Sequence, residues 1–147
     1  CSSDVCSSDL AQQQRAAARA LGEIGARGPA LEALRELAGS PVWRVRSDAA
    51  QALHRGGDEA RDLLVTLLAD DDAFVRRKAA ETLGGYGDPV AAGALVDFLE
   101  RSKDREDWPG EVAAQQALQR IARSKGPRTV AAWRAWLAQL DAGGPPR

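Results

Sequence analysis

The 147-residue sequence has no methionine, no asparagine, one histidine, one tyrosine and two phenylalanines. Aromatic and β-branched side chains favour strands, so their scarcity beside 29 alanines and 16 leucines predicts helices throughout. No apolar run approaches the roughly 18 residues that a membrane-spanning helix needs. With a net charge of -1 and 44% hydrophobic residues, the composition predicts one soluble helical domain with no membrane segment.

The first ten residues differ in composition from the rest: they repeat Cys-Ser-Ser-Asp and hold both cysteines, Cys1 and Cys6. Residues 5–10, Val-Cys-Ser-Ser-Asp-Leu, resemble the translation of a sequencing adapter, so we expect residues 1–10 to be non-native. The alternatives are a metal or redox site and an extracellular disulfide. The remaining chain has no cysteine, which excludes a disulfide-based secreted scaffold and favours the cytoplasm. The lack of methionine predicts the C-terminal fragment of a larger protein.

Sequence motifs of catalysis and metal binding are absent. The chain has no His-Glu-x-x-His, no Gly-x-Ser-x-Gly and no glycine-rich phosphate loop with lysine, and His54 is its only histidine. We therefore predict no catalytic residue, no metal and no cofactor. Nucleic acid is not favoured as a partner, because arginines alternate with acids instead of forming a basic face. Residues 76–78, Arg-Arg-Lys, could form a local basic stripe, but a solvated face with ion pairs is the preferred interpretation.

Prolines, glycines and aspartates divide the chain into short segments. Proline near the first position of a helix sacrifices no hydrogen bond, and glycine just after the last turn takes the left-handed conformation without a Cβ clash. The pattern predicts eight helices, at residues 11–25, 29–38, 41–55, 58–69, 72–85, 89–101, 109–124 and 127–140. Residues 141–147 are predicted to be a flexible tail.

An internal repeat of 30 residues relates two of these helices. The aligned positions are Val45 and Val75, Arg46 and Arg76, Ala49-Ala50 and Ala79-Ala80, and Leu53 and Leu83. A first copy, with Leu21-Gly22, lies 62 residues before Leu83-Gly84, and a fourth copy follows an insertion at 102–110. Self-similarity at this period predicts a solenoid, because one unit cannot bury its apolar face alone.

The pattern Val-Arg-x-x-Ala-Ala-x-x-Leu, preceded by Asp70-Asp71-Asp72 and followed by Gly-Asp, resembles HEAT repeats, in particular the short bacterial type of phycobilisome lyases. The resemblance covers residues 11–140 and implies an all-α, right-handed α-α superhelix (HEAT/armadillo-like solenoid) of about four helical pairs. It implies a protein-protein interaction or scaffolding module. The alternative is an enzyme on the same solenoid, of the bilin lyase or DNA glycosylase type.

We expect the second helix of each pair, which carries the Val-Arg pattern, to line the concave face and bind a protein or peptide. Its exposed positions would form a mixed-charge groove made of Arg44, Ser47, Gln51, Arg55, Arg77, Lys78, Glu81, Gln116, Gln119 and Arg120. Trp108, in the insertion, is the first candidate for a binding hot spot, and the alternative is a hydrophobic staple before the next helix. We expect a monomer.

Two further expectations concern packing. Arg46 and Arg76 are expected to pair with acidic groups of adjacent units, as the resemblance to HEAT ladders implies, and the alternative is an anion-binding ridge. Trp133, Trp136, Leu137 and Leu140 share one helix face, and they are expected to close the end of the solenoid. The alternative is an aromatic binding platform.

Overall fold

The computed structural model describes residues 3–143, with side chains described from residue 7 onward. Within this range the helices are α1 (Ser3–Ile24), α2 (Pro29–Ala38), α3 (Trp43–Ala52), α4 (Gly57–Leu67), α5 (Ala73–Tyr86), α6 (Ala92–Asp104), α7 (Trp108–Ala122) and α8 (Val130–Asp141), with 3₁₀ turns at Leu53–Arg55 and Pro89–Ala91. None of these helices is long and apolar enough to cross a membrane. The side chains of Cys1 and Cys6, and residues 144–147 of the predicted tail, lie outside the described part.

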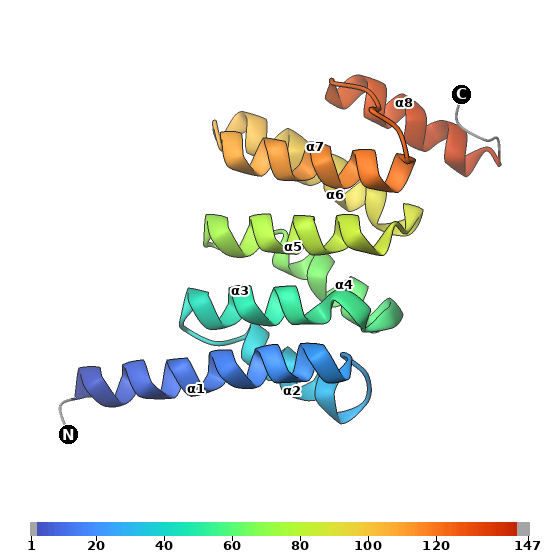
Figure 1. The fold of residues 1–147 in the computed structure, drawn as a ribbon. Helices are drawn as coiled ribbons and strands as arrows, with labels where there is room; N and C mark the ends of the chain where they lie inside the picture. The colour runs from blue at the N-terminus through green and yellow to red at the C-terminus, as the bar shows by residue number, and fades with distance from the viewer. Residues whose placement is uncertain (1–2, 144–147) are drawn as a thin grey trace.

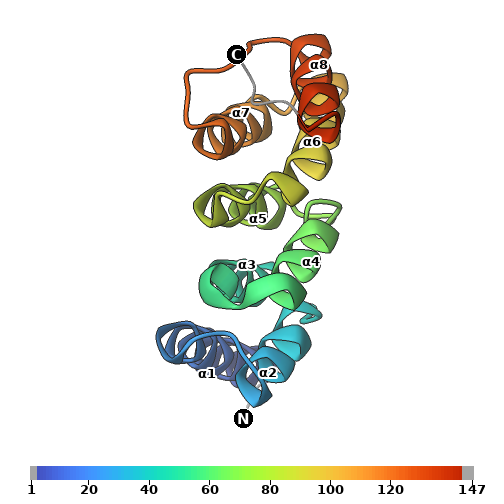
Figure 2. The same ribbon diagram turned by 90° about the vertical axis from the view of Figure 1, so that its right-hand side faces the viewer.

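The helices are stacked in two layers (Figures 1 and 2). The inner layer holds α1, α3, α5 and α7 side by side, and the outer layer holds α2, α4, α6 and α8. Each inner helix packs against the next inner helix, and α3, α5 and α7 each also pack against the outer helix that precedes them in the chain. The stack curves gently with the inner layer on its concave side (Figure 2). The predicted all-α solenoid of stacked helical pairs is confirmed.

Small residues set the spacing of the inner layer. The alanine pairs 49–50 and 79–80 have no exposed surface, so neighbouring helices approach closely at these points. Outer-layer leucines fill the space behind them: Leu64 and Leu67 of α4, and Leu68 just after it, are all at least 95% buried. Each fully buried leucine contributes about 1.5–3 kcal/mol to folding. Since these leucines pack against residues of adjacent pairs, the stack as a whole supplies the core.

Two glycines allow the closest approaches between inner helices. A Cβ at Gly22 of α1 would lie 2.9 Å from the Ala52 Cα, and a Cβ at Gly84 of α5 would lie 2.7 Å from the Ala117 Cα. Both distances are below any normal contact, so the repeated Leu-Gly pair is a packing requirement rather than a sign of flexibility.

The interface between α3 and α5 is built differently, because His54 stands at the repeat position that glycine occupies elsewhere. Here α3 ends at Ala52 and continues as the 3₁₀ turn, which leaves the imidazole of His54 exposed. The Tyr86 hydroxyl ties this turn to α5: it donates to the Leu53 carbonyl and accepts the Gly56 N–H at 3.0 Å. Burial raises the pKa of Tyr86.

Several helices begin at other residues than the sequence predicts. Helix α1 begins at Ser3 instead of residue 11, and α3 begins at Trp43 instead of Pro41, after Ser40 Oγ accepts the Val42 N–H at 3.2 Å. Asp58 caps nothing, since α4 begins at Gly57. Asp72 caps α5, with its carboxylate accepting the N–H groups of Phe74 and Val75.

The last helix also starts later than predicted. It begins at Val130 rather than residue 127, with Thr129 as its N-cap. The preceding segment is held across α7 by two amide side chains: Gln115 donates to the Pro127 carbonyl, and Gln119 donates to the Lys125 carbonyl at 2.6 Å. These bonds favour a non-helical backbone in the segment.

Helix α8 closes the C-terminal end of the stack, as expected. Trp133 is fully buried and Trp136 is 9% exposed, with their rings edge to face at 5.5 Å. Leu137 and Leu140 are partly buried against the same core. The two tryptophans are therefore core residues, and the alternative of an aromatic binding platform on this helix is wrong.

Candidate binding surface

Arginine–aspartate pairs join successive units. Arg46 of α3 donates to both carboxylate oxygens of Asp70 at 2.8 Å and to the Ser40 carbonyl at 2.9 Å. Arg61 of α4 likewise reaches Asp88 at 2.8 Å, and Arg15 of α1 reaches Asp48 of α3 at 2.7 Å. A bidentate guanidinium–carboxylate pair fixes orientation as well as distance. The predicted ion-pair ladder is confirmed at Arg46.

Arg76 occupies the equivalent place one repeat later. It is 9% exposed and donates to the carbonyls of Asp70 and Asp71 at 2.8 and 2.9 Å, and its second terminal nitrogen lies 3.5 Å from Asp107. Because the Arg76 guanidinium is paired with these three acceptors, it is not available to form a basic stripe with residues 77 and 78. The alternative of an anion-binding ridge is wrong for both repeated arginines.

These contacts change the titration of two carboxylates. Burial raises the pKa of Asp70, but hydrogen bonds from Arg46 and from the Asp72 N–H together lower it by more. The pKa of Asp70 therefore lies below the usual value. At Asp88 the hydrogen bond from the Val90 N–H lowers the pKa, burial opposes this, and the bond from Arg61 lowers it again. The folded protein therefore stabilises both side chains more as ionised carboxylates than as neutral acids.

A pH dependence of stability follows from the direction of these shifts. A carboxyl group whose pKa is lower in the folded state stabilises the fold above its unfolded pKa, and this contribution is lost as the pH falls through the folded pKa. We expect the free energy of unfolding to decrease below about pH 4. Asp70→Asn should be less stable at neutral pH and should lose less on acidification, in urea unfolding followed by circular dichroism. Asp71→Asn, at an exposed position, is the control. Equal acid sensitivity of wild type and Asp70→Asn would contradict the assignment.

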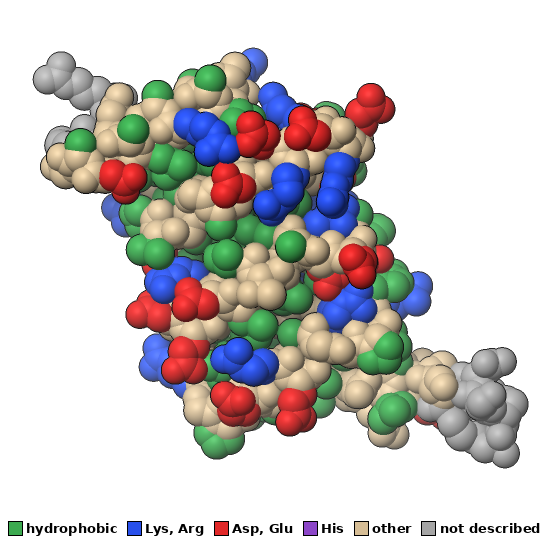
Figure 3. Space-filling model, turned by 180° about the vertical axis from the view of Figure 1, so that it is seen from behind, with side chains coloured by type: hydrophobic (Ala, Val, Ile, Leu, Met, Phe, Trp, Pro, Cys, Tyr) green, Lys and Arg blue, Asp and Glu red, His purple; other side chains and the backbone are tan. Residues whose placement is uncertain are grey.

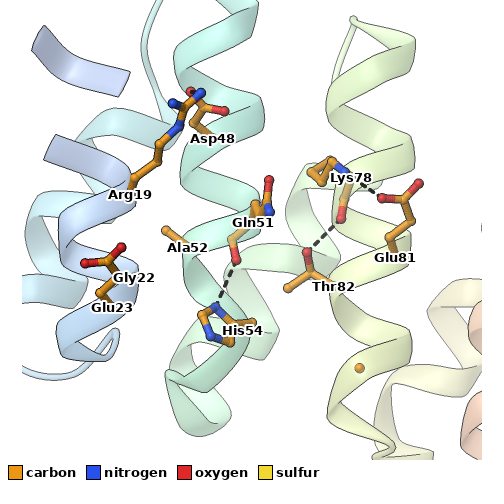
Figure 4. Close-up of a pocket in the computed structure, with 11 residues that line it drawn as sticks. Arg19, Gly22, Glu23, Asp48, Gln51, Ala52, His54, Lys78, Glu81 and Thr82 are labelled. Atoms are coloured by element: carbon orange, nitrogen blue, oxygen red, sulfur yellow. Dashed lines mark hydrogen bonds and ion pairs between the residues drawn. The ribbon is translucent and has the colours of Figure 1, made fainter. Parts of the chain in front are cut away.

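A groove crosses the inner layer over α1, α3 and α5 (Figure 4). It has a volume of about 550 Å³ and is lined by Arg19, Gly22, Glu23, Asp48, Gln51, Ala52, His54, Lys78, Glu81, Thr82 and Gly85. Small residues from each helix, Gly22, Ala52 and Gly85, leave the space. We call this the inner groove.

Several polar side chains of the inner groove are paired but remain partly exposed. Lys78 donates to Glu81 at 2.7 Å, and the side chains of these two residues are 32% and 38% exposed. Arg19 lies 3.5 Å from Asp48, and His54 Nδ1 lies 3.2 Å from the Gln51 carbonyl. Exposed pairs of this kind contribute little to stability, so they can exchange partners with a ligand at small cost.

A second feature lies at the N-terminal ends of α3 and α5. The rings of Trp43 and Phe74 stack at 5.3 Å, with the Arg44 guanidinium 4.7 Å from the Trp43 ring and that of Arg77 4.4 Å from the Phe74 ring. The four side chains form an inter-repeat stack in which each arginine covers an aromatic face. Both arginines are thus held against rings instead of projecting freely over the concave face.

Trp108 begins α7 and stands between two further grooves. One has a volume of about 460 Å³ and is lined by Leu99, Lys103, Trp108, Glu111, Val112, Gln115, Gln116, Gln119 and Arg128. The other has about 280 Å³ and is lined by Arg77, Glu81, Trp108, Pro109, Val112, Ala113 and Gln116. Trp108 is 71% exposed and is the first residue of α7, so the alternative of a hydrophobic staple before this helix is wrong.

The outer layer forms the opposite face of the described part of the molecule, and its charged side chains are of both signs. Figure 3 shows Lys and Arg side chains interspersed with Asp and Glu over the outer layer. Among residues whose side chains are described, no three His, Cys, Asp or Glu residues lie close enough together to hold a metal ion.

Two family models match this sequence. The model for HEAT repeats matches residues 43–108, and the model for the PBS lyase HEAT-like repeat matches residues 13–40. The chain belongs to the HEAT repeat family. The matches run from α1 to the first residue of α7, so they include all three inner helices that form the inner groove. No curated protein gave a significant match.

In the structure, the expected binding residues fall into four groups. Gln51, Lys78 and Glu81 line the inner groove, and Trp108, Gln116 and Gln119 line the grooves beside α7. Arg44 and Arg77 belong to the inter-repeat stack. Ser47, Arg55 and Arg120 line none of these grooves: Ser47 is half-buried, and the two arginines are exposed.

The residues of α1 that line the inner groove were not predicted from the sequence. Arg19 and Glu23 were not expected there, because the first HEAT unit has Gln13-Gln14 in place of Val-Arg and its register was therefore weakly defined. The alanine pair 17–18 and Gly22 carry the register, and extending it from α3 to α1 would have found these residues. Asp48, His54 and Thr82 also line the groove without having been predicted, and His54 is exposed because α3 gives way to the 3₁₀ turn after Ala52.

Proposed function

We propose that this HEAT domain is a protein-binding module whose partner segment lies in the inner groove. The observation that carries the proposal is the groove itself, which three successive inner helices build with small residues beneath and charged and amide side chains around. Its volume of about 550 Å³ is in the range of ligand-binding clefts.

The chemistry of the groove suits an extended peptide better than a small apolar ligand. Gln51 can both donate and accept hydrogen bonds, and Lys78 and Glu81 can each bind an opposite charge. An extended peptide backbone likewise presents both hydrogen-bond donors and hydrogen-bond acceptors. Partly exposed ion pairs also favour specificity and association rate more than raw affinity, which is typical of a reversible docking site.

A steric block tests the proposal without assuming the charge of the partner. A library of random dodecapeptides displayed on phage would be selected on the intact chain, and the selected peptides would be measured against Gln51→Trp and Thr66→Trp. Gln51 lies in the inner groove, whereas Thr66 is exposed on α4 of the outer layer. We expect Gln51→Trp to weaken binding at least about tenfold, equivalent to about 1.4 kcal/mol, and Thr66→Trp to leave it unchanged.

Circular dichroism would first establish that both variants have the helical content and melting temperature of the wild type. If the selected peptides bind the two variants equally, the inner groove is not the binding site and the proposal is wrong. If no peptide is enriched on the intact chain, the protein-binding role itself fails.

A further inference from the structure

The turn that carries Trp108 is fixed on several sides. The N–H of Asp107 donates to the Ser102 carbonyl at 2.8 Å, and the Asp107 carboxylate caps α7 by accepting the Gly110 N–H at 3.1 Å. The same carboxylate lies 3.5 Å from Arg76 of α5. A Cβ at Gly110 would lie 2.5 Å from Asp107 Oδ2, so only glycine allows this arrangement. Trp108 is thus presented by a rigid support.

The exposure of Trp108 is unusual within this chain. Trp133 and Trp136 are buried, and Trp43 is covered by Phe74 and Arg44, whereas the Trp108 indole is 71% exposed. When a partner covers a large apolar side chain that a fixed turn holds in water, the burial lowers the free energy of the complex. Tryptophan is also among the residues most enriched at the energetic centres of protein interfaces.

The larger groove beside Trp108 carries more positive than negative side chains. The larger of the two grooves beside Trp108 places Lys103 and Arg128 around the apolar side chains of Leu99 and Val112, with Glu111 as its one acid. Lys103 and Arg128 make no ion pair within the described residues. This groove therefore combines an apolar surface with a net positive rim.

We propose that the groove beside Trp108 binds an acidic peptide segment, in which an apolar side chain lies on the indole and a neighbouring carboxylate pairs with Lys103 and Arg128. This assignment rests on the proposed protein-binding function and names the chemistry of the partner at a second contact. Charge complementarity supports it, because two unpaired cations face the groove on which the indole opens.

Short synthetic peptides test this assignment directly. The probes are N-acetylated hexapeptide amides of the form Gly-Gly-Leu-Z-Gly-Gly, where Z is Asp, Lys or Ser, added up to millimolar concentration. The indole N–H resonance of Trp108, assigned from Trp108→Ala, would be followed by two-dimensional NMR, with that of Trp43 as the internal control. We expect the Asp peptide to shift the Trp108 signal and to bind about two- to fivefold more tightly than the Lys peptide, as exposed ion pairs allow.

A charge-swapped protein makes the test specific. In the double variant Lys103→Glu, Arg128→Glu the preference should reverse towards the Lys peptide, whereas Arg101→Glu, at an exposed cation of α6 outside the groove, should leave it unchanged. Equal binding of Asp and Lys peptides to the wild type, or no shift with any peptide, would overturn the assignment. Either result would leave the inner groove untouched, because that site is tested separately by Gln51→Trp.

Discussion

Trp133→Ala is expected to lower the free energy of unfolding by about 3–5 kcal/mol, the range for removing a large aromatic side chain from a core. Trp133 is fully buried, packs edge to face on Trp136, and donates its indole N–H to Gln115 Oε1 at 3.0 Å. The fit is tight, since a Cβ at Gly126 would lie 2.5 Å from the ring. Urea unfolding followed by circular dichroism would measure the loss.

The matched control for this prediction is Trp108→Ala. It removes the same side chain from a position that is 71% exposed, so the change in stability should be within about 0.5 kcal/mol. A large difference between the two variants would show that α8 is part of the cooperative core. Losses of equal size would mean that α8 does not close the stack as described.

Gly84→Val is expected to destabilise the fold by about 1–3 kcal/mol, the usual cost of forcing extra atoms into a packed interface. The added Cβ alone would lie 2.7 Å from the Ala117 Cα and 2.9 Å from the Ala117 Cβ, so α5 and α7 would have to separate. The better helix propensity of valine, a few tenths of a kcal/mol relative to glycine, does not offset this clash.

The neighbouring glycine provides the control for this substitution. Gly85 lies in the same helix, is exposed, and has no atom within 4 Å of a Cβ built on it. Gly85→Val should therefore change stability by a few tenths of a kcal/mol only. Thermal melts of both variants would measure the difference, and equal melting temperatures would rule out the close contact between α5 and α7.

The repeated core could be predicted from the sequence because its signals are local and periodic. The alanine pairs 49–50 and 79–80 and the leucines that follow them recur at a spacing of 30 residues, and both copies are fully buried in the structure. The ladder arginine Arg46 was predictable for the same reason. Its partner Asp70 comes from the loop before the next inner helix, a position that the repeat also fixes.

Helix boundaries were less predictable, because side-chain hydrogen bonds compete with proline and glycine signals. Pro41 and Pro127 both precede helices, but the helices begin two and three residues later, at Trp43 and Val130. At the second site, contacts from Gln115 hold the chain in a non-helical path. Because this hydrogen bond joins residues of different elements, it cannot be predicted from a local sequence pattern.

The candidate surface was predictable in part for a related reason. Gln51, Lys78 and Glu81 could be placed on one face from helical periodicity, and they do line one groove. The pairing of Arg44 and Arg77 with aromatic rings was not predictable, since it depends on Trp43 and Phe74 meeting across two helices. Trp108 was chosen for its residue type, and its rigid support is visible only in the folded chain.

We propose the inner layer of this HEAT domain as its binding surface. The most direct measurement is backbone NMR of the isotope-labelled intact chain, titrated with a peptide selected on it. We predict chemical-shift changes at Gln51, Lys78 and Glu81, which line the inner groove, and little change along α2 and α4. Changes confined to the outer layer, with those three residues unaffected, would contradict the claim.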